Sequence, residues 1–282
     1  MKTLSIVLTL LFYSAALGFS AETESGDYPG LTELRLVTDA TSVQPGEPIT
    51  VGLWIRHAED FHTYWKNPGI VGIATMFDWK LPEGWTASEI TWPTPQKTIM
   101  ATLTAWGHEG DGTCLLATLT PPKTIEGSEV ALKTRVGWMA CARTCHPGWH
   151  DFELKLPVSN QVTEPDEKWA TVFQEARAAL PQPIPKDWAF SLTEPAKKTE
   201  GEFTLTIESP EPLPADQEGY LFSYDNQIDS DSPQTLRRID DRTLELTLIY
   251  PSFAPSQRPD AVTGLIHLPG WEGEFFEISV PW

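Results

Sequence analysis

The sequence has few basic residues, few cysteines and, after its first 20 residues, no long apolar run. Lys and Arg number 20 against 39 Asp and Glu, which gives a formal net charge of −19. A chain this acidic repels nucleic acid and anionic lipid, so neither is expected as a partner. No phosphate-binding loop, dinucleotide fingerprint or nucleophile elbow occurs, and we expect no cofactor. Because no apolar run after residue 20 is long enough to span a membrane, we predict a mature protein that is not embedded in one.

The first 20 residues have the pattern of an export signal. Lys2 precedes an apolar run over residues 4–17, and small residues follow at Gly18 and Ser20. The run is too short for a comfortable membrane span, and no charged stop-transfer segment follows it. We therefore predict a signal peptide over residues 1–20 and a protein that is periplasmic or otherwise exported, and soluble after cleavage.

Short segments of alternating apolar and polar residues recur along the rest of the chain. Residues 49–55 and 132–138 are clear examples in the first half, and residues 203–207 and 244–250 in the second. This period of two is typical of half-buried strands, and turn residues such as Pro and Gly separate the segments. The pattern predicts an all-β protein made of two antiparallel β-sandwiches.

Between the two strand-rich regions the apolar residues change to a helical spacing, over residues 164–180. Three prolines at positions 181, 183 and 185 then end the helix. We predict a first sandwich domain over residues 26–160, a short helix with a Pro-rich connector over residues 161–185, and a second sandwich domain over residues 186–282. The second domain has no cysteine, so structural support or partner binding is its expected role.

The sequence contains only three cysteines, Cys114, Cys141 and Cys145. In an exported protein, neighbours such as Cys141 and Cys145 are expected to be oxidised, or to cycle between disulfide and dithiol. A domain of this size needs no disulfide for stability, and so small a ring removes little chain entropy. Pro147-Gly148 marks a tight turn near the pair, which places it at a domain edge that a partner's sulfur can reach. Cys114 is interpreted as a buried, small apolar residue.

Three interpretations of this segment remain open on spacing alone. A redox-active pair and a permanent structural disulfide are about equally compatible with the spacing. Arg143 and His146 would favour exchange by stabilising a thiolate. The third interpretation is a Cu(I) or Zn(II) site with the pattern C-x3-C-H-x3-H, although a hairpin does not place four such side chains on one side. Its ligands would be Cys141, Cys145, His146 and His150.

Several blocks of residues resemble the periplasmic amino-terminal domain of the DsbD thiol:disulfide interchange family, in particular its suppressor-of-copper-sensitivity-like branch. The resemblance extends over most of residues 30–158, with the blocks in the family's order. The blocks are W-M-A-C-A-R-T-C-H-P-G at 138–148, H-T-Y-W-K-N-P-G at 62–69, W-P-T-P at 92–95 and W-G-H-E-G at 106–110.

The resemblance implies immunoglobulin-like sandwiches and a cysteine pair that exchanges disulfides. Cys141 and Cys145 would receive electrons from a membrane partner and pass them to other exported thiol proteins, in cytochrome c biogenesis or copper tolerance. Full-length family members continue into a membrane domain and a thioredoxin-like domain, whereas this sequence ends at Trp282. We therefore expect a stand-alone protein with a separate membrane electron donor of the DsbD type. Whether it counts as an enzyme, as a protein-disulfide reductase component, stays open.

Residues in the same blocks are candidates for supporting roles. His62, Tyr64 and Trp65 could shield the disulfide as a lid, with ordinary core packing as the alternative for the aromatic residues. His108 and Glu109 could form a proton relay near the thiols. Further supporting candidates are Trp106, Trp138, Arg143 and His146.

Two functional hypotheses follow from these residues. The first is an exported electron-transfer module that cycles between a Cys141–Cys145 disulfide and a dithiol. The second is a non-catalytic binding protein, in which the β domains recognise a partner while the disulfide closes a loop or the thiols hold copper. Sequence alone does not say which cysteine attacks.

Overall fold

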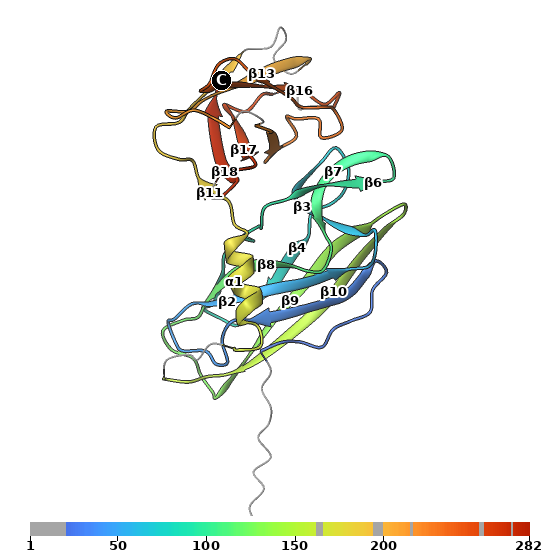
Figure 1. Ribbon diagram of the computed structural model, residues 1–282. Helices are drawn as coiled ribbons and strands as arrows, with labels where there is room; N and C mark the ends of the chain where they lie inside the picture. The colour runs from blue at the N-terminus through green and yellow to red at the C-terminus, as the bar shows by residue number, and fades with distance from the viewer. Residues whose placement is uncertain (1–20, 162–165, 194–199, 215–216, 254–256, 272) are drawn as a thin grey trace, which may run out of the picture.

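The computed structural model describes residues 21–161, 166–193, 200–214, 217–253, 257–271 and 273–282. The predicted signal peptide, residues 1–20, lies outside the described residues. Within them the chain forms four sheets and one helix (Figure 1). No helix in these ranges is long and apolar enough to cross a membrane. The predicted class, an all-β protein of two β-sandwiches joined by a short helix, is confirmed.

Two antiparallel sheets form the first sandwich. One has the strand order β1-β2-β8-β5, and the other β10-β9-β3-β7-β6 with β4 paired to β9. Their strands are β1 (Leu31–Thr38), β2 (Ile49–His57), β3 (His62–Gly69), β4 (Met76–Lys80), β5 (Thr86–Ala87), β6 (Gln96–Met100), β7 (Leu103–Glu109), β8 (Thr113–Thr120), β9 (Glu129–Cys141) and β10 (Cys145–Pro157).

The period of two decides which side chains enter the core of this sandwich. Along β9, Leu132, Val136 and Trp138 are buried, whereas Lys133 and Arg135 between them are exposed. Successive residues of a strand point to opposite faces, so one face of the long β9–β10 hairpin is apolar and packs on the facing sheet. The other face of the hairpin carries the cysteine pair.

Helix α1 (Ala170–Ala178) is shorter than the helical pattern in the sequence. The carboxylate of Asp166 accepts a hydrogen bond of 3.0 Å from the backbone N–H of Trp169, just before the helix. Phe173 and Ala176 of the helix form one apolar cluster with Cys114 on β8. In Figure 1 the helix, drawn in yellow, lies beside β2 and β8 and leads to the second sandwich. It therefore completes the first sandwich as well as connecting the two.

The second sandwich also has two sheets, with strand orders β11-β18-β17-β14 and β12-β13-β16-β15. The segment of the predicted Pro-rich connector at residues 182–183 pairs in parallel with β18, so part of the connector belongs to this sandwich. The strands are β11 (Gln182–Pro183), β12 (Ala189–Thr193), β13 (Glu202–Glu208), β14 (Tyr220–Ser223), β15 (Thr235–Arg238), β16 (Thr243–Ile249), β17 (Ala261–His267) and β18 (Phe275–Pro281).

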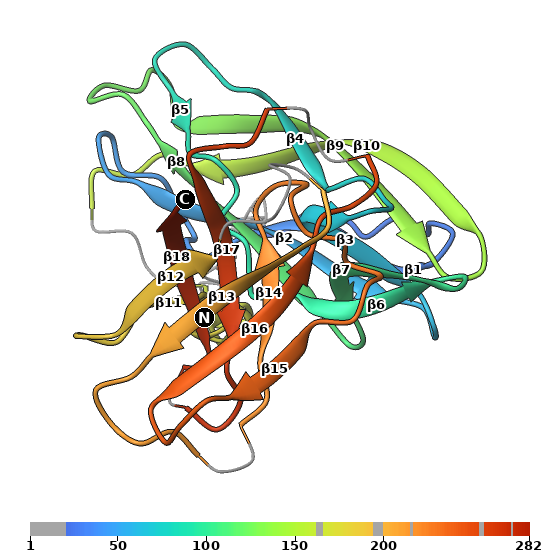
Figure 2. The same ribbon diagram turned by 90° about the horizontal axis from the view of Figure 1, so that it is seen from above.

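The two sandwiches share apolar core residues. Trp65 on β3 and Trp106 on β7 are 1% and 0% exposed and belong to the apolar cluster of the second sandwich. The Asn67 side-chain amide donates hydrogen bonds to the backbone oxygens of Ser223 (3.0 Å) and Asp225 (2.6 Å). Figure 2, seen from above, places β14 next to β3 and β7. Strand β3 therefore reaches from Cys141, which is opposite its first residue His62, to the contact between the two sandwiches.

Candidate redox site

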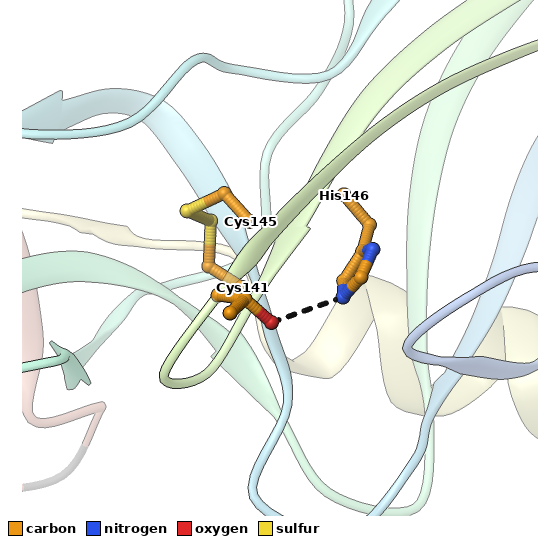
Figure 3. The surroundings of a disulfide bond; sticks show 4 residues. Cys141, Cys145 and His146 are labelled. Atoms are coloured by element: carbon orange, nitrogen blue, oxygen red, sulfur yellow. Dashed lines mark hydrogen bonds between the residues drawn. A yellow bond between two sulfur atoms is a disulfide. The ribbon is translucent and has the colours of Figure 1, made fainter.

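The cysteine pair closes the tip of the β9–β10 hairpin. Cys145 and Cys141 are directly opposite each other in the strand register, with Cα atoms 4.2 Å apart and sulfurs 2.02 Å apart in a disulfide (Figure 3). Directly opposed residues of an antiparallel pair point to the same face, so the register alone brings the two sulfurs together. Only Ala142, Arg143 and Thr144 lie between the two strands.

The two cysteines differ in their access to solvent. Cys141 is 0% exposed, whereas Cys145 is exposed. Cys141 lies in an apolar cluster with Tyr64 and Ala105, against which Met100 and Met139 pack. A sulfur of another protein can therefore reach Cys145, while Cys141 is shielded.

Part of this shield comes from the hairpin of β6 and β7, which the sequence analysis did not connect to the site. Met100, the last residue of β6, packs on the cluster that buries Cys141. The backbone N–H of the next residue, Ala101, donates a hydrogen bond of 3.2 Å to the backbone oxygen of Ala142 at the tip of the disulfide hairpin. The only sequence signal is the apolar pair Ile99-Met100, which follows three polar residues.

His62 lies beside Cys141 in the sheet. It is opposite Cys141 on one side and opposite Glu109 on the other, so these three residues share one face. Burial lowers the pKa of His62 to about 4 and raises the pKa of Tyr64 to about 12. The two rings meet edge to face with centroids 5.1 Å apart. At neutral pH both are uncharged, so they cover Cys141 as neutral groups and bring no positive charge to a thiolate.

His108 points away from the disulfide, so the predicted relay of His108 and Glu109 is not assembled there. It lies opposite Thr63, one residue along from the His62–Glu109 pair, and therefore faces the other side of the sheet. Full burial lowers its pKa to about 3. On the same side, Nε2 of His57 is 3.0 Å from Oγ1 of Thr63, and burial lowers the pKa of His57 to about 4.

The three tryptophans proposed as supporting residues also point away from the sulfurs. Trp65 follows Tyr64 in the strand and alternates to the other face, into the second sandwich with Trp106. Trp138 lies in the core of the first sandwich, edge to face with Tyr28 at 4.8 Å. The predicted lid therefore consists of His62 and Tyr64 without Trp65.

His146 and Arg143 do not surround the sulfurs either. The His146 side chain lies on the opposite face of the hairpin from Cys145, as Figure 3 shows, with Nε2 3.1 Å from Oγ1 of Thr144. Arg143 lies in the turn at the tip and borders a cavity that also involves Thr144 and Ala142. The predicted assistance of a thiolate by His146 thus has no support from its position.

The metal site considered for this segment is not assembled. His146 and His150 are even-numbered residues of β10, on the face that packs on the core, whereas Cys145 is on the other face. Among the described residues, no group of three or more His, Cys, Asp or Glu is placed to hold a metal ion. The alternation of the strand separates the four ligands that the spacing suggested.

Cys114 lies in the other sheet of the sandwich, under helix α1. It is 3% exposed, and burial raises the pKa of its thiol to about 12. A protonated thiol under a helix is a poor nucleophile. Its position agrees with the interpretation as a buried apolar residue.

A cysteine pair at the tip of a long hairpin, with one sulfur open to partners and the other shielded, meets the geometric requirement of thiol–disulfide exchange. Residues 33–157 match the family model described as the N-terminal part of the thiol:disulfide interchange protein DsbD. This part of the chain is a DsbD N-terminal-like domain, as the residue blocks predicted.

A solved structure shares the fold of both sandwiches. The N-terminal periplasmic domain of ScsB from Proteus mirabilis aligns with 93% of this chain and 99% of its own, with a TM-score of 0.65 and 15% sequence identity. A protein of unknown function from Porphyromonas gingivalis W83 aligns over 87% of this chain and 97% of its own at 10% identity. Its TM-score of 0.24 is too low to indicate a shared fold. Comparison with curated proteins finds no match.

Proposed function

We propose that this protein is an exported electron-transfer module that passes reducing equivalents through Cys141 and Cys145 to other exported thiol proteins. The observation that carries the proposal is the unequal exposure of one disulfide, with Cys145 exposed and Cys141 at 0%. An exchanging pair needs one sulfur that a partner can attack and one that leaves and returns without meeting other thiols. A disulfide with a purely structural role has no such requirement.

The reduction step begins at Cys145. A thiolate of the donor attacks Cys145 Sγ, the Cys141–Cys145 bond breaks, and Cys141 leaves as a thiolate that takes up a proton. A second donor thiolate then attacks the donor sulfur of this mixed disulfide, which releases Cys145 as a thiolate and leaves the donor oxidised. Two electrons and one proton have then moved to the pair, and a second proton follows when the Cys145 thiolate is protonated.

The pair passes its electrons on by the reverse sequence. The Cys145 thiolate attacks a disulfide of the acceptor and forms a mixed disulfide, while the other acceptor sulfur leaves and is protonated. Cys141, after losing its proton, attacks Cys145 Sγ, which restores the Cys141–Cys145 bond and releases the second acceptor thiol. Because Cys141 is buried in the cluster with Tyr64 and Ala105, it reacts with its neighbour rather than with thiols in solution.

The proposed place of this exchange is the periplasm, with a separate membrane protein of the DsbD type as electron donor. The match of residues 33–157 to the DsbD N-terminal family supports an interchange role. The structurally similar ScsB domain is described as periplasmic. Together with the apolar segment at residues 4–17 of the sequence, these similarities favour an exported protein.

Redox titration of the full chain tests the proposal. The purified protein is equilibrated in glutathione or dithiothreitol buffers, and its free thiols are trapped and counted. We expect the pair to be half reduced at a potential above about −300 mV, as exchanging disulfides are. A pair that stays oxidised well below about −300 mV would be a structural disulfide and would refute the proposal. Cys141→Ser abolishes the transition and serves as the control.

A further inference from the structure

An apolar groove lies on the outer face of strands β4, β9 and β10. It encloses about 430 Å³, and its walls are almost entirely apolar. Ile73 and Met76 border it on one side, and Pro147 and Trp149 on the other, with Met139 at the end nearer the hairpin tip. None of these residues has a part in the exchange chemistry described above.

The groove continues directly from the disulfide. Cys145, Pro147 and Trp149 alternate with core-facing residues of β10 and therefore share one face. In the strand register they are opposite Cys141, Met139 and Gly137. Because two residues of a strand span about 7 Å, Pro147 lies about 7 Å and Trp149 about 14 Å along the strand from Cys145.

The side chains that border the groove are unusually exposed for their type. Trp149 is 69% exposed, Met76 59% and Ile73 52%, and they are three of the six large exposed apolar side chains in the described ranges. Gathered apolar exposure of this kind marks an interaction surface. Gly137 lies in the floor with space above it, because a Cβ there would meet only Met76 Cε at 3.6 Å and the backbone oxygen of Gly148 at 4.0 Å, both ordinary contacts.

We propose that this groove binds an extended, apolar segment that flanks the reactive cysteine of the thiol protein exchanging with Cys145. The inference rests on the proposed function, because a mixed disulfide holds the partner's sulfur about 2 Å from Cys145 Sγ. The chain on one side of that cysteine must then lie along β10. In an extended partner segment, residues two and four positions from the cysteine reach Pro147 and Trp149, since both strands advance by the same length per residue.

The chemistry of the groove favours apolar side chains in the partner. Charged groups lie only at the end away from the hairpin tip, where Asp78 and Arg135 line the groove and are opposite each other in the strand register. Arg135 is also paired with Asp151, through two nitrogen–oxygen contacts of 2.9 and 2.8 Å. Burial of apolar surface against Trp149, Met76 and Ile73 is then the main source of binding free energy.

Two synthetic peptides test the proposal with the oxidised full chain. Each has one cysteine, and they differ only at the second and fourth positions after it, which are Leu in one and Ser in the other. The rate of reduction of the Cys141–Cys145 disulfide is measured for both, with glutathione as a small thiol. We expect the Leu peptide to react about tenfold faster than the Ser peptide, the effect of burying about 55 Å² more apolar surface.

Variants of residues that line the groove locate the effect. Ile73→Ser and Trp149→Ala are expected to remove most of the preference for the Leu peptide, and Gly137→Leu, which fills the groove, to abolish it. The rate with glutathione stays within about twofold of the parent, because a small thiol does not occupy the groove. The matched control is Ile239→Ser, an Ile of the second sandwich that is 44% exposed, and it retains the preference.

The outcomes separate this inference from the proposed function. Equal rates for the two peptides, or a preference that survives both Ile73→Ser and Trp149→Ala, overturn the groove as the binding site. If glutathione exchanges normally in that case, the redox function stands without the groove. If neither glutathione nor either peptide reduces the disulfide, the proposed function fails and the groove proposal fails with it.

Discussion

At the scale of single residues, the most informative feature is the contrast between the two sulfurs of one disulfide. Cys141 is fully buried in a cluster with Tyr64, against which Met100 packs, whereas Cys145 is exposed. The sequence identifies the pair by its spacing and its neighbouring residue blocks, although spacing alone leaves an exchanging and a structural disulfide equally open. It gives no sign of which sulfur is open, because the residues that bury Cys141 come from positions about 40 and 80 residues away in the chain.

The contrast predicts different behaviour for the two single-cysteine variants. With oxidised glutathione, Cys141→Ser is expected to form a mixed disulfide at Cys145 about tenfold or more faster than Cys145→Ser forms one at Cys141, because access controls exchange. Mass spectrometry of samples quenched over time measures both rates. Cys114→Ala should change neither rate, since that thiol is buried with its pKa raised to about 12. Similar rates for the two variants would contradict the assignment of Cys145 as the attacked sulfur.

The buried imidazoles of His57 and His108 predict a loss of stability in acid. Their folded-state pKa values are lowered to about 4 and about 3, whereas in the unfolded chain each accepts a proton near pH 6.5. The free energy of unfolding is therefore highest above about pH 6.5 and falls as the pH decreases toward 4. The slope is up to about 1.4 kcal/mol per pH unit for each imidazole.

Urea unfolding between about pH 4.5 and 7 measures this slope. His108→Gln is expected to reduce it by up to about 1.4 kcal/mol per pH unit, since one proton fewer is taken up on unfolding. The comparison uses the slope of the free energy of unfolding against pH. A destabilisation by His108→Gln that is the same at every pH therefore does not affect the result. An unchanged slope would show that His108 does not titrate in the expected way.

At the scale of elements, the alternation of side chains along β3, β7, β9 and β10 decides which candidate residues lie on the face of the disulfide. It sends His62 and Tyr64 to the disulfide and Trp65 and His108 to the other face. It also separates His146 from Cys145, which removes the metal site. The sequence contained this information, but it becomes usable only once the strand limits and the register are known.

The β6–β7 hairpin leads to a prediction at this scale. Met100→Ala is expected to speed the reduction of the disulfide by dithiothreitol about threefold or more, because a better solvated Cys141 thiol has a lower pKa and leaves more readily. Stopped-flow or quenched thiol assays measure the rate.

The neighbouring residue supplies the control for this prediction. Ile99 is 56% exposed and lies outside the cluster around Cys141. Ile99→Ala should therefore leave the reduction rate unchanged. If both variants accelerate reduction equally, general loosening of the hairpin explains the effect, and Met100 is not a specific cover.

At the scale of the whole molecule, two tryptophans of the first sandwich are part of the core of the second. Trp106 is 0% exposed, and its indole N–H donates a hydrogen bond of 3.1 Å to the hydroxyl of Tyr220. Trp65 packs against Phe222 and Tyr224. The second sandwich therefore does more than follow the first in sequence, since it buries residues of strands that also cover Cys141.

This shared core predicts a large effect of one substitution on the stability of both sandwiches. Trp106→Ala is expected to lower the free energy of unfolding by about 3–5 kcal/mol, the usual cost of removing a fully buried Trp side chain. Urea unfolding followed by circular dichroism measures it. Trp79→Ala is the control, because Trp79 is only partly buried on β4 and its loss should cost less. Equal costs would mean that the contact between sandwiches contributes little.

The sequence by itself determined the strands, through their period of two and the turn residues between them, and the cysteine pair of a DsbD N-terminal-like domain, through its blocks of neighbouring residues. Both are local signals, since a strand pattern states that one face of a segment is buried. What covers that face depends on contacts between residues far apart in the chain. Only the tertiary structure therefore decided that Cys141 is shielded, that Trp65 and Trp106 serve the second sandwich, and that an open apolar groove leads away from Cys145.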